Sequence, residues 1–583
     1  MAGFHLTRDD ETIDTRIAAA RARFVSHGFS RFTPVAVPGY RGFHVGYIHG
    51  GPDTILHAGE DLIVVAGTLT YDGLIGRPAL ARLLAEFTFP FTDWARLSGQ
   101  FVLLVRKGGR AFVLNDFFGS FQLFHDPAHT TLSTSFLATA EAQPRLNWHA
   151  QAVYEFAFNV FPLGNDTVFT NVARLGPYAQ LELTADGVTE HPVSKALPDH
   201  TSDIPIEERI QRNSDVLNAV VMPFVEAFGD AMQCPLSGGL DSRLALALLR
   251  AHGVRPHVYV YGEPDDEDVQ VARAIGAKEG FAVELFNKPN FAQITPDQFS
   301  EIVQRNFDET DALVTDGGLF DNGGNAHARH ARNANGQLAV SGGCGEVFRN
   351  FFYLPDRALK VRDVAQSFFA RFVASDATDR FDPRAFLATI EAKLARSLGR
   401  RPDDRLSRTE AEQLYPRERC RVFFGREISL VGRHGAYLMP FLHRSVVSEA
   451  VQIPMDLKRA GRFEAMLLNR IDPALARHMS AYGHNFAEPP SRAHVRDEWQ
   501  TIMRPPWARR RSYAVRRMIN RRTRDEHGGL LSPIFLGRII DLHFPAMQRF
   551  FRPERVAQDS GLYRRVATLE YLAGQLGSRI EDE

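Results

Sequence analysis

The amino-acid sequence predicts an α/β protein, and three observations along the chain support this class. Residues 1 to about 195 contain short β-rich runs separated by glycine-containing turns. From about residue 205, predicted strands alternate with predicted helices, which is typical of a doubly wound parallel sheet. Beyond about residue 355, apolar residues recur mostly at helical spacing. A length of 583 residues also favours more than one domain.

The first part of the chain is predicted to be mainly β-structure. Its clearest predicted strands are Leu62–Ala66, Gln100–Val105 and Ala111–Leu114. A fourth, Tyr178–Thr184, alternates apolar and polar residues before an Ala-Asp-Gly turn. The polar, proline-containing stretch from Pro192 to Pro205 then predicts a boundary between residues 1–195 and residues 205–583.

The second part begins with a predicted helix from Glu207, followed by alternating elements. The strands are predicted at Met232–Leu236 and Val258–Tyr261. The helices that follow them are predicted at Arg243–His252, which ends at a glycine, and at Asp265–Gly280. This order predicts a parallel sheet with helices on its faces, followed by the helical C-terminal part.

Composition and charge exclude several classes of protein. Lys and Arg total 68 against 69 Asp and Glu, so no global charge attracts nucleic acid, whose binding is therefore disfavoured. Three cysteines cannot form a disulfide framework. The first twenty residues are too charged for a signal peptide, and no apolar run is long enough for a membrane span. We therefore expect a cytoplasmic protein.

The segment Leu236-Ser-Gly-Gly-Leu-Asp-Ser242 lies between a predicted strand and a predicted helix. Gly238 and Gly239 allow the backbone to approach a ligand closely, and the N–H groups that open the helix favour an anion. Ser237 and Ser242 add hydroxyl donors, while Asp241 would hold Mg²⁺ against phosphate oxygens. The alternative is a plain turn in which Asp241 and Ser242 cap the helix.

This loop resembles the pyrophosphate-binding loop of the ATP pyrophosphatases, specifically that of the asparagine synthetase family. Four later segments are similar to landmarks of that family, namely Tyr259–Gly262 with Asp265–Asp268, Leu338–Gly342, Met439–Leu442 and Ile453–Lys458. The resemblance implies that residues 205–583 form an ATP-binding synthetase domain. It also implies that Leu236 to Ser242 bind ATP and that Tyr261, Ser341 and Gly342 frame its adenosine.

The first part resembles the glutaminase domain of the same family. The similar segments, in order, are Leu97–Phe101, Asn115–Gly119, Leu132–Ser135 and Thr167–Pro177. The resemblance implies an αββα sandwich of the N-terminal-nucleophile (Ntn) type over residues 1–195, followed by the doubly wound ATP-pyrophosphatase domain.

Departures from the family pattern indicate that the glutaminase is degenerate. Family members that use glutamine have a nucleophilic cysteine at position 2, where this chain has Ala2. Their glutamine-holding Asn-Gly-Glu is replaced here by Ala66-Gly-Thr68. A class II glutamine amidotransferase-like domain without glutaminase activity is the resulting expectation.

The synthetase part also departs from the family at its acceptor side. An acceptor-side Glu or Tyr is replaced by Gly343. In an alignment without a gap, which we favour, Glu346 falls on the position of a second Mg²⁺-binding carboxylate; with a gap of one residue, that ligand would be missing. The family's later Glu and Arg fall on Ala436 and Leu438. The catalytic Lys has no clean counterpart, which leaves Lys458 and Arg462 as the candidate catalytic cations, whose charge would stabilise an anionic transition state.

The segments that resemble the family's nucleotide-binding site match its pattern, whereas the acceptor-side residues differ from it. This combination predicts a ligase that uses ATP and Mg²⁺. It would adenylate a carboxylate and join it to an amine, each a small molecule or a peptide, with release of AMP and pyrophosphate. The β-lactam synthetases and the cyclases of lasso peptides are family branches with this architecture. Two alternatives remain: an asparagine synthase that uses ammonia, and a non-catalytic relative that binds nucleotide or peptide.

Two further features carry charge or metal-ligating atoms. Arg504 to Arg524 contains nine arginines, which suggests a docking surface for an acidic peptide or carrier protein or, in the alternative, a solvated helix with paired arginines. His327 and His330 follow a Gly-Gly pair, but the sequence shows no third metal ligand at a telling distance. Exposed or hydrogen-bonded histidines are therefore the favoured interpretation.

Overall fold

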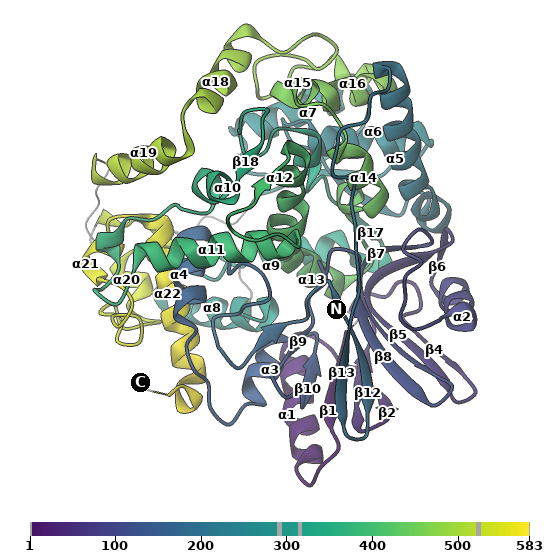
Figure 1. Ribbon diagram of the computed structural model, residues 1–583, viewed down its shortest axis with the longest axis vertical. Helices are drawn as coiled ribbons and strands as arrows, with labels where there is room; N and C mark the ends of the chain where they lie inside the picture. The colour runs from purple at the N-terminus through teal and green to yellow at the C-terminus, as the bar shows by residue number, and fades with distance from the viewer. Residues whose placement is uncertain (1–2, 288–293, 313–317, 520–525, 582–583) are drawn as a thin grey trace.

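Figure 1 shows a computed structural model of the protein, which describes residues 3–287, 294–312, 318–519 and 526–581. The fold mixes helices with two large antiparallel sheets, one parallel sheet and a short antiparallel pair of strands, so the predicted α/β class is confirmed. Ala2 lies outside the described residues.

The first antiparallel sheet has six strands in the order β11-β9-β10-β1-β3-β2. These strands are β1 (Gly3–Arg8), β2 (Thr33–Val37), β3 (Tyr40–Val45), β9 (Phe124–His125), β10 (Thr131–Ser133) and β11 (Ala173–Arg174). Helices α1 (Ile13–Ser26) and α3 (Phe136–Glu141) pack against β1 and β10.

The second antiparallel sheet has seven strands, with β13-β12-β8-β7-β5-β4 in order and β6 paired to β5. They are β4 (Ile55–Ala58), β5 (Asp61–Tyr71), β6 (Leu74–Ile75), β7 (Leu97–Lys107), β8 (Arg110–Asn115), β12 (Ala179–Thr184) and β13 (Gly187–Pro192). The four strands predicted from sequence lie within β5, β7, β8 and β12 and are confirmed. Helix α2 (Arg77–Glu86) packs against β4 and β5, and β5 also contacts β1 of the first sheet.

The third sheet is parallel and has five strands in the order β16-β15-β14-β17-β20. They are β14 (Met232–Pro235), β15 (His257–Tyr261), β16 (Val283–Phe286), β17 (Leu338–Val340) and β20 (Tyr437–Leu438). The predicted parallel sheet is thus confirmed. Helix α6 (Asp241–Ala251) begins two residues before the predicted Arg243, since Asp241 favours the positive end of the helix dipole.

Helices fill most of the remaining chain, as predicted. Those between residues 150 and 400 are α4 (Ala150–Asn159), α5 (Ile206–Phe228), α7 (Glu267–Glu279), α8 (Pro296–Thr310), α9 (Gly324–Arg332), α10 (Val361–Phe368) and α11 (Pro383–Ser397). Those after residue 440 include α14 (Arg444–Val451), α15 (Met455–Lys458), α16 (Arg462–Ile471), α17 (Pro473–Ala476), α18 (Arg492–Met503), α19 (Pro506–Ile519), α20 (Pro533–Leu536), α21 (Pro553–Val556) and α22 (Ser560–Leu576). A short pair, β18 (Leu359–Lys360) with β19 (Arg405–Leu406), interrupts them.

One continuous helical run crosses the middle of the protein. It consists of α12 (Arg408–Leu414), a π-helix (Tyr415–Phe424) and α13 (Gly425–His434). Most of its side chains are buried, and α13 packs against β5 of the second sheet. The run therefore connects the strand-rich first part with the parallel-sheet part.

The two parts share one continuous apolar core, and polar groups also join them. Asp311, which is fully buried after α8, accepts hydrogen bonds from Ser135 Oγ at 2.8 Å and from the N–H of Phe136 at 2.7 Å. Its carboxylate lies 3.4 Å from His27 and 3.3 Å from Arg433, both buried. A single carboxylate thus caps α3 and neutralises an arginine of α13.

The end of the described chain returns to its first part. Helix α22 packs against α4, and the N–H of Leu146 donates to the carbonyl of Arg579 at 2.7 Å. Figure 1 shows α22, in yellow, beside α4. None of the described helices is both long and apolar enough to cross a membrane.

Candidate functional site

The predicted phosphate loop connects β14 to α6, at the carboxyl end of the central strand of the parallel sheet. The hydroxyls of Ser237 and Ser242 lie 2.9 Å apart, and the N–H of Ser237 donates to Ser242 Oγ at 2.9 Å. The N–H of Gly238 donates to the carboxylate of Asp268 at 2.8 Å. The loop is therefore folded back on itself, with its two serines side by side.

Two carboxylates contact one guanidinium beside this loop, and a third, that of Glu346, acts on it through its charge. Arg349 donates to both oxygens of Asp241, to Oδ2 at 2.5 Å, and its Nε lies 3.2 Å from Glu464 Oε2. Glu346 also acts electrostatically on Arg349 and on Glu464. One guanidinium cannot neutralise three ionised carboxylates, but within the described residues these three do not meet at one point as a preformed metal site would.

The electrostatics of these carboxyl groups favour a proton on Glu464 when no cation is bound. Burial and the negative charge of Asp241 raise the pKa of Glu464 well above its usual range, although Arg349 opposes the rise. Burial alone would lower the pKa of Arg349, but Asp241, Glu464 and Glu346 raise it well above its usual range. Glu464 is fully buried, and neither of its carboxylate oxygens has a hydrogen-bond partner within the described structure. A buried, under-neutralised carboxylate is a typical cation ligand.

Glu346 is held in place from the helical run. The hydroxyl of Tyr415, at the start of the π-helix, donates to Glu346 Oε2 at 2.5 Å. Tyr415 is buried, and burial together with the nearby acidic groups raises its pKa well above 10. The tyrosine therefore remains a neutral donor at physiological pH and orients the carboxylate.

A cavity of about 810 Å³ opens next to the cluster. Leu240, Glu346, Lys458 and Tyr482 line the end near the phosphate loop. Seven arginines contribute to its wall: Arg349, Arg371, Arg504, Arg509, Arg510, Arg516 and Arg517. Because so many cations face one enclosed space, the cavity favours an anionic occupant.

The two candidate catalytic cations lie in different surroundings. Lys458 lines the cavity but is buried, donating to the carbonyl of Val347 at 2.9 Å and to Glu412 at 3.2 Å. Burial lowers the pKa of Lys458, while Glu412 opposes this shift. Arg462, the first residue of α16, is exposed and lies outside the residues that line the cavity. The structure thus brings Lys458, but not Arg462, to the cavity.

The residues expected to frame adenosine lie along the same edge of the parallel sheet. Tyr261 ends β15, is partly exposed and stacks on Phe286 with ring centroids 5.5 Å apart. It lines a second cavity of about 620 Å³. Ser341 and Gly342 follow β17, beside the first turn of α6.

Gly342 allows the loop after β17 to touch the helix that follows the phosphate loop. A Cβ atom on Gly342 would lie 2.7 Å from the backbone nitrogen of Ser242 and 2.9 Å from the carbonyl carbon of Asp241. Both neighbours are main-chain atoms and cannot rotate away. Contact between the two loops therefore requires glycine at this position.

We expect Gly342→Ala to destabilise the folded protein by about 1–3 kcal/mol, the usual effect of overpacking. Gly239→Ala is the matched control, because its added Cβ would meet the hydroxyls of Ser237 and Tyr482 only at an ordinary 3.4 Å. Denaturant midpoints of the two variants measure the difference. Equal midpoints would contradict the close approach of the loops.

Gly67 and Thr68, which the sequence comparison placed at a glutamine-holding position, are engaged in packing. Tyr47 donates to the carbonyl of Gly67 at 2.6 Å, and the N–H of Tyr437 donates to Thr68 Oγ1 at 2.9 Å. Thr68 is buried. The space beside Gly67 and Thr68 measures about 10 Å³, roughly the room for one water molecule.

The arginine-rich segment coincides largely with α19, although residues 520–525, with Arg521, Arg522 and Arg524, lie outside the described residues. Arg517 pairs with Asp376 at 2.6 Å, and Arg509 donates to the carbonyl of Phe352 at 2.9 Å. Arg511 is exposed and lies over the ring of Trp507, 5.2 Å from its centroid. The segment thus directs arginines into the cavity as well as outward, and a docked partner remains a prediction.

Sequence reasoning missed Arg349 and Glu464. Glu464 lies between Phe463 and the pair Leu467 and Leu468 on the buried face of α16, so an acidic residue at an apolar position was the available signal. Arg349 follows Glu346 by three residues, and no pattern in the sequence distinguishes it from the other arginines.

Comparison with known proteins finds similarity only among solved structures. No family model matches the sequence, and no curated protein matches it. Among solved structures, an allosteric regulatory enzyme of purine biosynthesis matches with a TM-score of 0.23 and 11% identity, over 50% of this chain and 81% of that chain. Glutamine phosphoribosylpyrophosphate amidotransferase from B. subtilis matches with a TM-score of 0.22 and 13% identity, over 48% of this chain and 65% of that chain.

Proposed function

We propose that this protein is an ATP- and Mg²⁺-dependent ligase that forms an amide bond, with an Ntn amidotransferase-like first part that has no glutaminase activity. The observation that carries the proposal is the pair of carboxylates, Asp241 and Glu464, on Arg349, with Glu346 on the wall of the large arginine-lined cavity beside the predicted phosphate loop. A divalent cation, an anion-binding loop and space for a second substrate are the parts that adenylation requires.

The proposed reaction has two steps. A carboxylate oxygen of the first substrate attacks the α-phosphorus of ATP, an O–P bond forms, and the bond to the β-phosphate breaks with release of pyrophosphate. The amine then attacks the activated carbonyl carbon, the C–N bond forms, and AMP leaves with the former carboxylate oxygen. The amine proton passes to solvent. Holding both substrates in one cavity supplies much of the acceleration.

Different residues of this chain would bind the phosphates, hold the metal ion and stabilise negative charge. Ser237, Gly238, Gly239 and Ser242 would bind the phosphates, and Asp241, Glu346 and Glu464 would hold Mg²⁺. When bound, the ion supplies positive charge against the phosphate oxygens of ATP. Arg349 would move from Asp241 toward phosphate, while Lys458 would stabilise negative charge from its position on the cavity wall.

The arginines of the cavity support a substrate that carries negative charge. Arg371, Arg510 and Arg516 line the wall, and a carboxylate is the group that a guanidinium binds with two parallel hydrogen bonds. The small space at Gly67 and Thr68 supports the absence of glutamine hydrolysis. The amine would therefore come from a substrate or from free ammonia.

Exchange of labelled pyrophosphate into ATP tests this function. We expect the intact protein with Mg²⁺ and a mixture of amino acids and dicarboxylates to catalyse the exchange. Asp241→Asn should reduce it by at least 100-fold, because one charge that positions the cation is lost. Asp215→Asn, at an exposed position of α5, is the control and should leave the rate unchanged. Failure of the Mg²⁺-loaded protein to bind ATP in calorimetry would overturn the proposal.

A second candidate, a non-catalytic nucleotide-binding relative, is favoured by one observation. The N–H of Gly238 is already bonded to Asp268, and Arg349 already neutralises Asp241, so the loop is closed by its own residues. This candidate predicts ATP binding by calorimetry without pyrophosphate exchange for any carboxylate in the mixture.

A further inference from the structure

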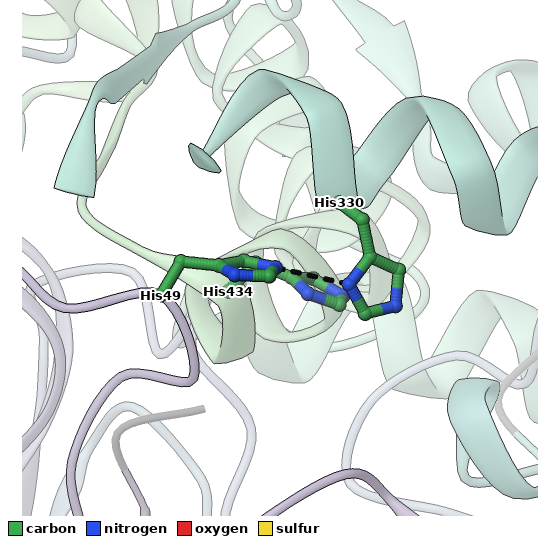
Figure 2. A group of neighbouring side chains, drawn as sticks. All are labelled: His49, His330 and His434. Atoms are coloured by element: carbon green, nitrogen blue, oxygen red, sulfur yellow. Dashed lines mark hydrogen bonds between the residues drawn. The ribbon is translucent and has the colours of Figure 1, made fainter. Parts of the chain in front are cut away.

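Three histidines from distant parts of the chain meet at one point beside the second cavity. His49 lies in the loop after β3, His330 lies in α9, and His434 is the last residue of α13. Figure 2 shows the three imidazole rings gathered together, with His330 pointing toward the other two. The sequence showed no further metal ligand near His330, whereas the fold brings His49 and His434 beside it.

The distances between the rings are those of a compact ligand set. His49 Nε2 lies 2.9 Å from His330 Nδ1, and one ring nitrogen from each residue lies within 4.8 Å of the others. In a tetrahedral site with Zn–N bonds of 2.0–2.1 Å, ligating nitrogens lie roughly 3.3 Å apart. Small rotations of the side chains would therefore bring the three nitrogens to ligating positions.

His434 provides an independent observation that points to a ligand. It is 1% exposed, and neither of its ring nitrogens has a hydrogen-bond partner within the described part of the chain. Buried polar atoms are normally paired, so two unpaired nitrogens on one buried ring require an explanation. A metal ion bound through one of them is such an explanation.

Backbone hydrogen bonding holds two of the histidines together, and the cavity beside His330 leaves the cluster open to solvent. The N–H of His49 donates to the carbonyl of His434 at 3.0 Å, which ties the loop after β3 to α13. Glu309 Oε1 lies 3.8 Å from His434 Nε2 and 2.8 Å from Arg329 Nη1, so this carboxylate already has a cationic partner. His330 lines the 620 Å³ cavity, which gives a metal ion access to solvent.

We propose that His49, His330 and His434 bind one divalent transition-metal ion of the zinc class, with solvent from the cavity as the fourth ligand. Imidazole nitrogens favour Zn²⁺, Cu²⁺ and Ni²⁺ over Mg²⁺, so this site differs chemically from the carboxylate cluster at Asp241. It is independent of the proposed ligase activity. The ion would bridge the strand-rich part and the parallel-sheet part, because its ligands come from both.

The test uses the full chain without an affinity tag, freed of metal with a chelator and titrated with Zn²⁺ in calorimetry. We expect one ion per chain, and Co²⁺ in its place should give the visible absorption bands of a four-coordinate site. Removing one ligand, in His330→Ala or His434→Ala, should weaken Zn²⁺ binding by at least 100-fold. His330 is exposed, so its variant keeps the test valid if loss of the buried His434 impairs folding.

His327→Ala is the matched control. His327 lies three residues before His330 on the same helix, is exposed and lines the same cavity, but it is not part of the cluster. Its variant should bind Zn²⁺ as the unmodified chain does. Absence of a stoichiometric Zn²⁺ site, or unchanged affinity in both His330→Ala and His434→Ala, would overturn the proposal.

Discussion

Arg349→Met is expected to destabilise the metal-free protein by about 3 kcal/mol. The guanidinium is the positive charge that meets both Asp241 and Glu464, and Glu464 is fully buried. Its removal leaves the buried Glu464 without this positive charge, and burial and the charge of Asp241 already disfavour the ionised form of Glu464. The midpoint of chemical denaturation, measured in buffer with a chelator, should fall accordingly.

Added Mg²⁺ should restore part of this loss, because a bound cation stabilises only the folded state. Glu464→Gln in the Arg349→Met background should also recover stability, since it removes a carboxyl group that must take up a proton to be buried. Arg462→Met is the control. Because this arginine is exposed, its substitution should change the free energy of unfolding by less than about 0.5 kcal/mol. An Mg²⁺ response no larger in Arg349→Met than in the unmodified chain would show that these carboxylates do not form a cation site.

Asp311→Asn is expected to destabilise the protein by about 3–5 kcal/mol at pH 7, the usual effect of breaking a buried ion pair. Arg433 would remain buried 3.3 Å from an uncharged group, and α3 would lose the carboxylate that caps it. Asp297→Asn, at an exposed position of α8, is the matched control and should be nearly neutral.

The effect of Asp311 should depend on pH in a defined direction. Burial opposes ionisation, but His27 and Arg433 outweigh it and lower the pKa of Asp311 from 3.8 to about 2. A carboxylate with a lowered folded-state pKa stabilises the fold above its unfolded pKa, so the full contribution is present above about pH 4. The difference between Asp311→Asn and the unmodified chain should shrink by about 2 kcal/mol as the pH falls from 4 to 2. A difference that stays constant over this range would contradict the assignment.

The strands, and the position of the Ser237–Ser242 loop between β14 and α6, were predictable because their signals are local. Leu62–Ala66 is a continuous β-branched and apolar run, and the Ser-Gly-Gly segment lies directly between a strand and a helix. Arg349 and Glu464 were not predictable in this way. Their roles depend on a contact between the loop after β17 and helix α16, which are more than a hundred residues apart.

The histidine cluster illustrates the same limit more sharply. A metal site on one helix or hairpin leaves a spacing that can be recognised in sequence, such as two histidines one turn apart. His49, His330 and His434 have no such spacing, because three separate elements bring them together. The cluster can be recognised only in the folded protein, where the loop after β3 lies beside α9 and α13.

The helical run from Arg408 to His434 places a constraint on the length of the chain. Tyr415 within it orients Glu346, and His434 at its end enters the histidine cluster. Each residue added to or removed from a helix turns everything beyond it by about 100°. An insertion or deletion of one residue between Tyr415 and His434 would therefore misalign one of the two groups, while substitutions in the same stretch would leave both aligned.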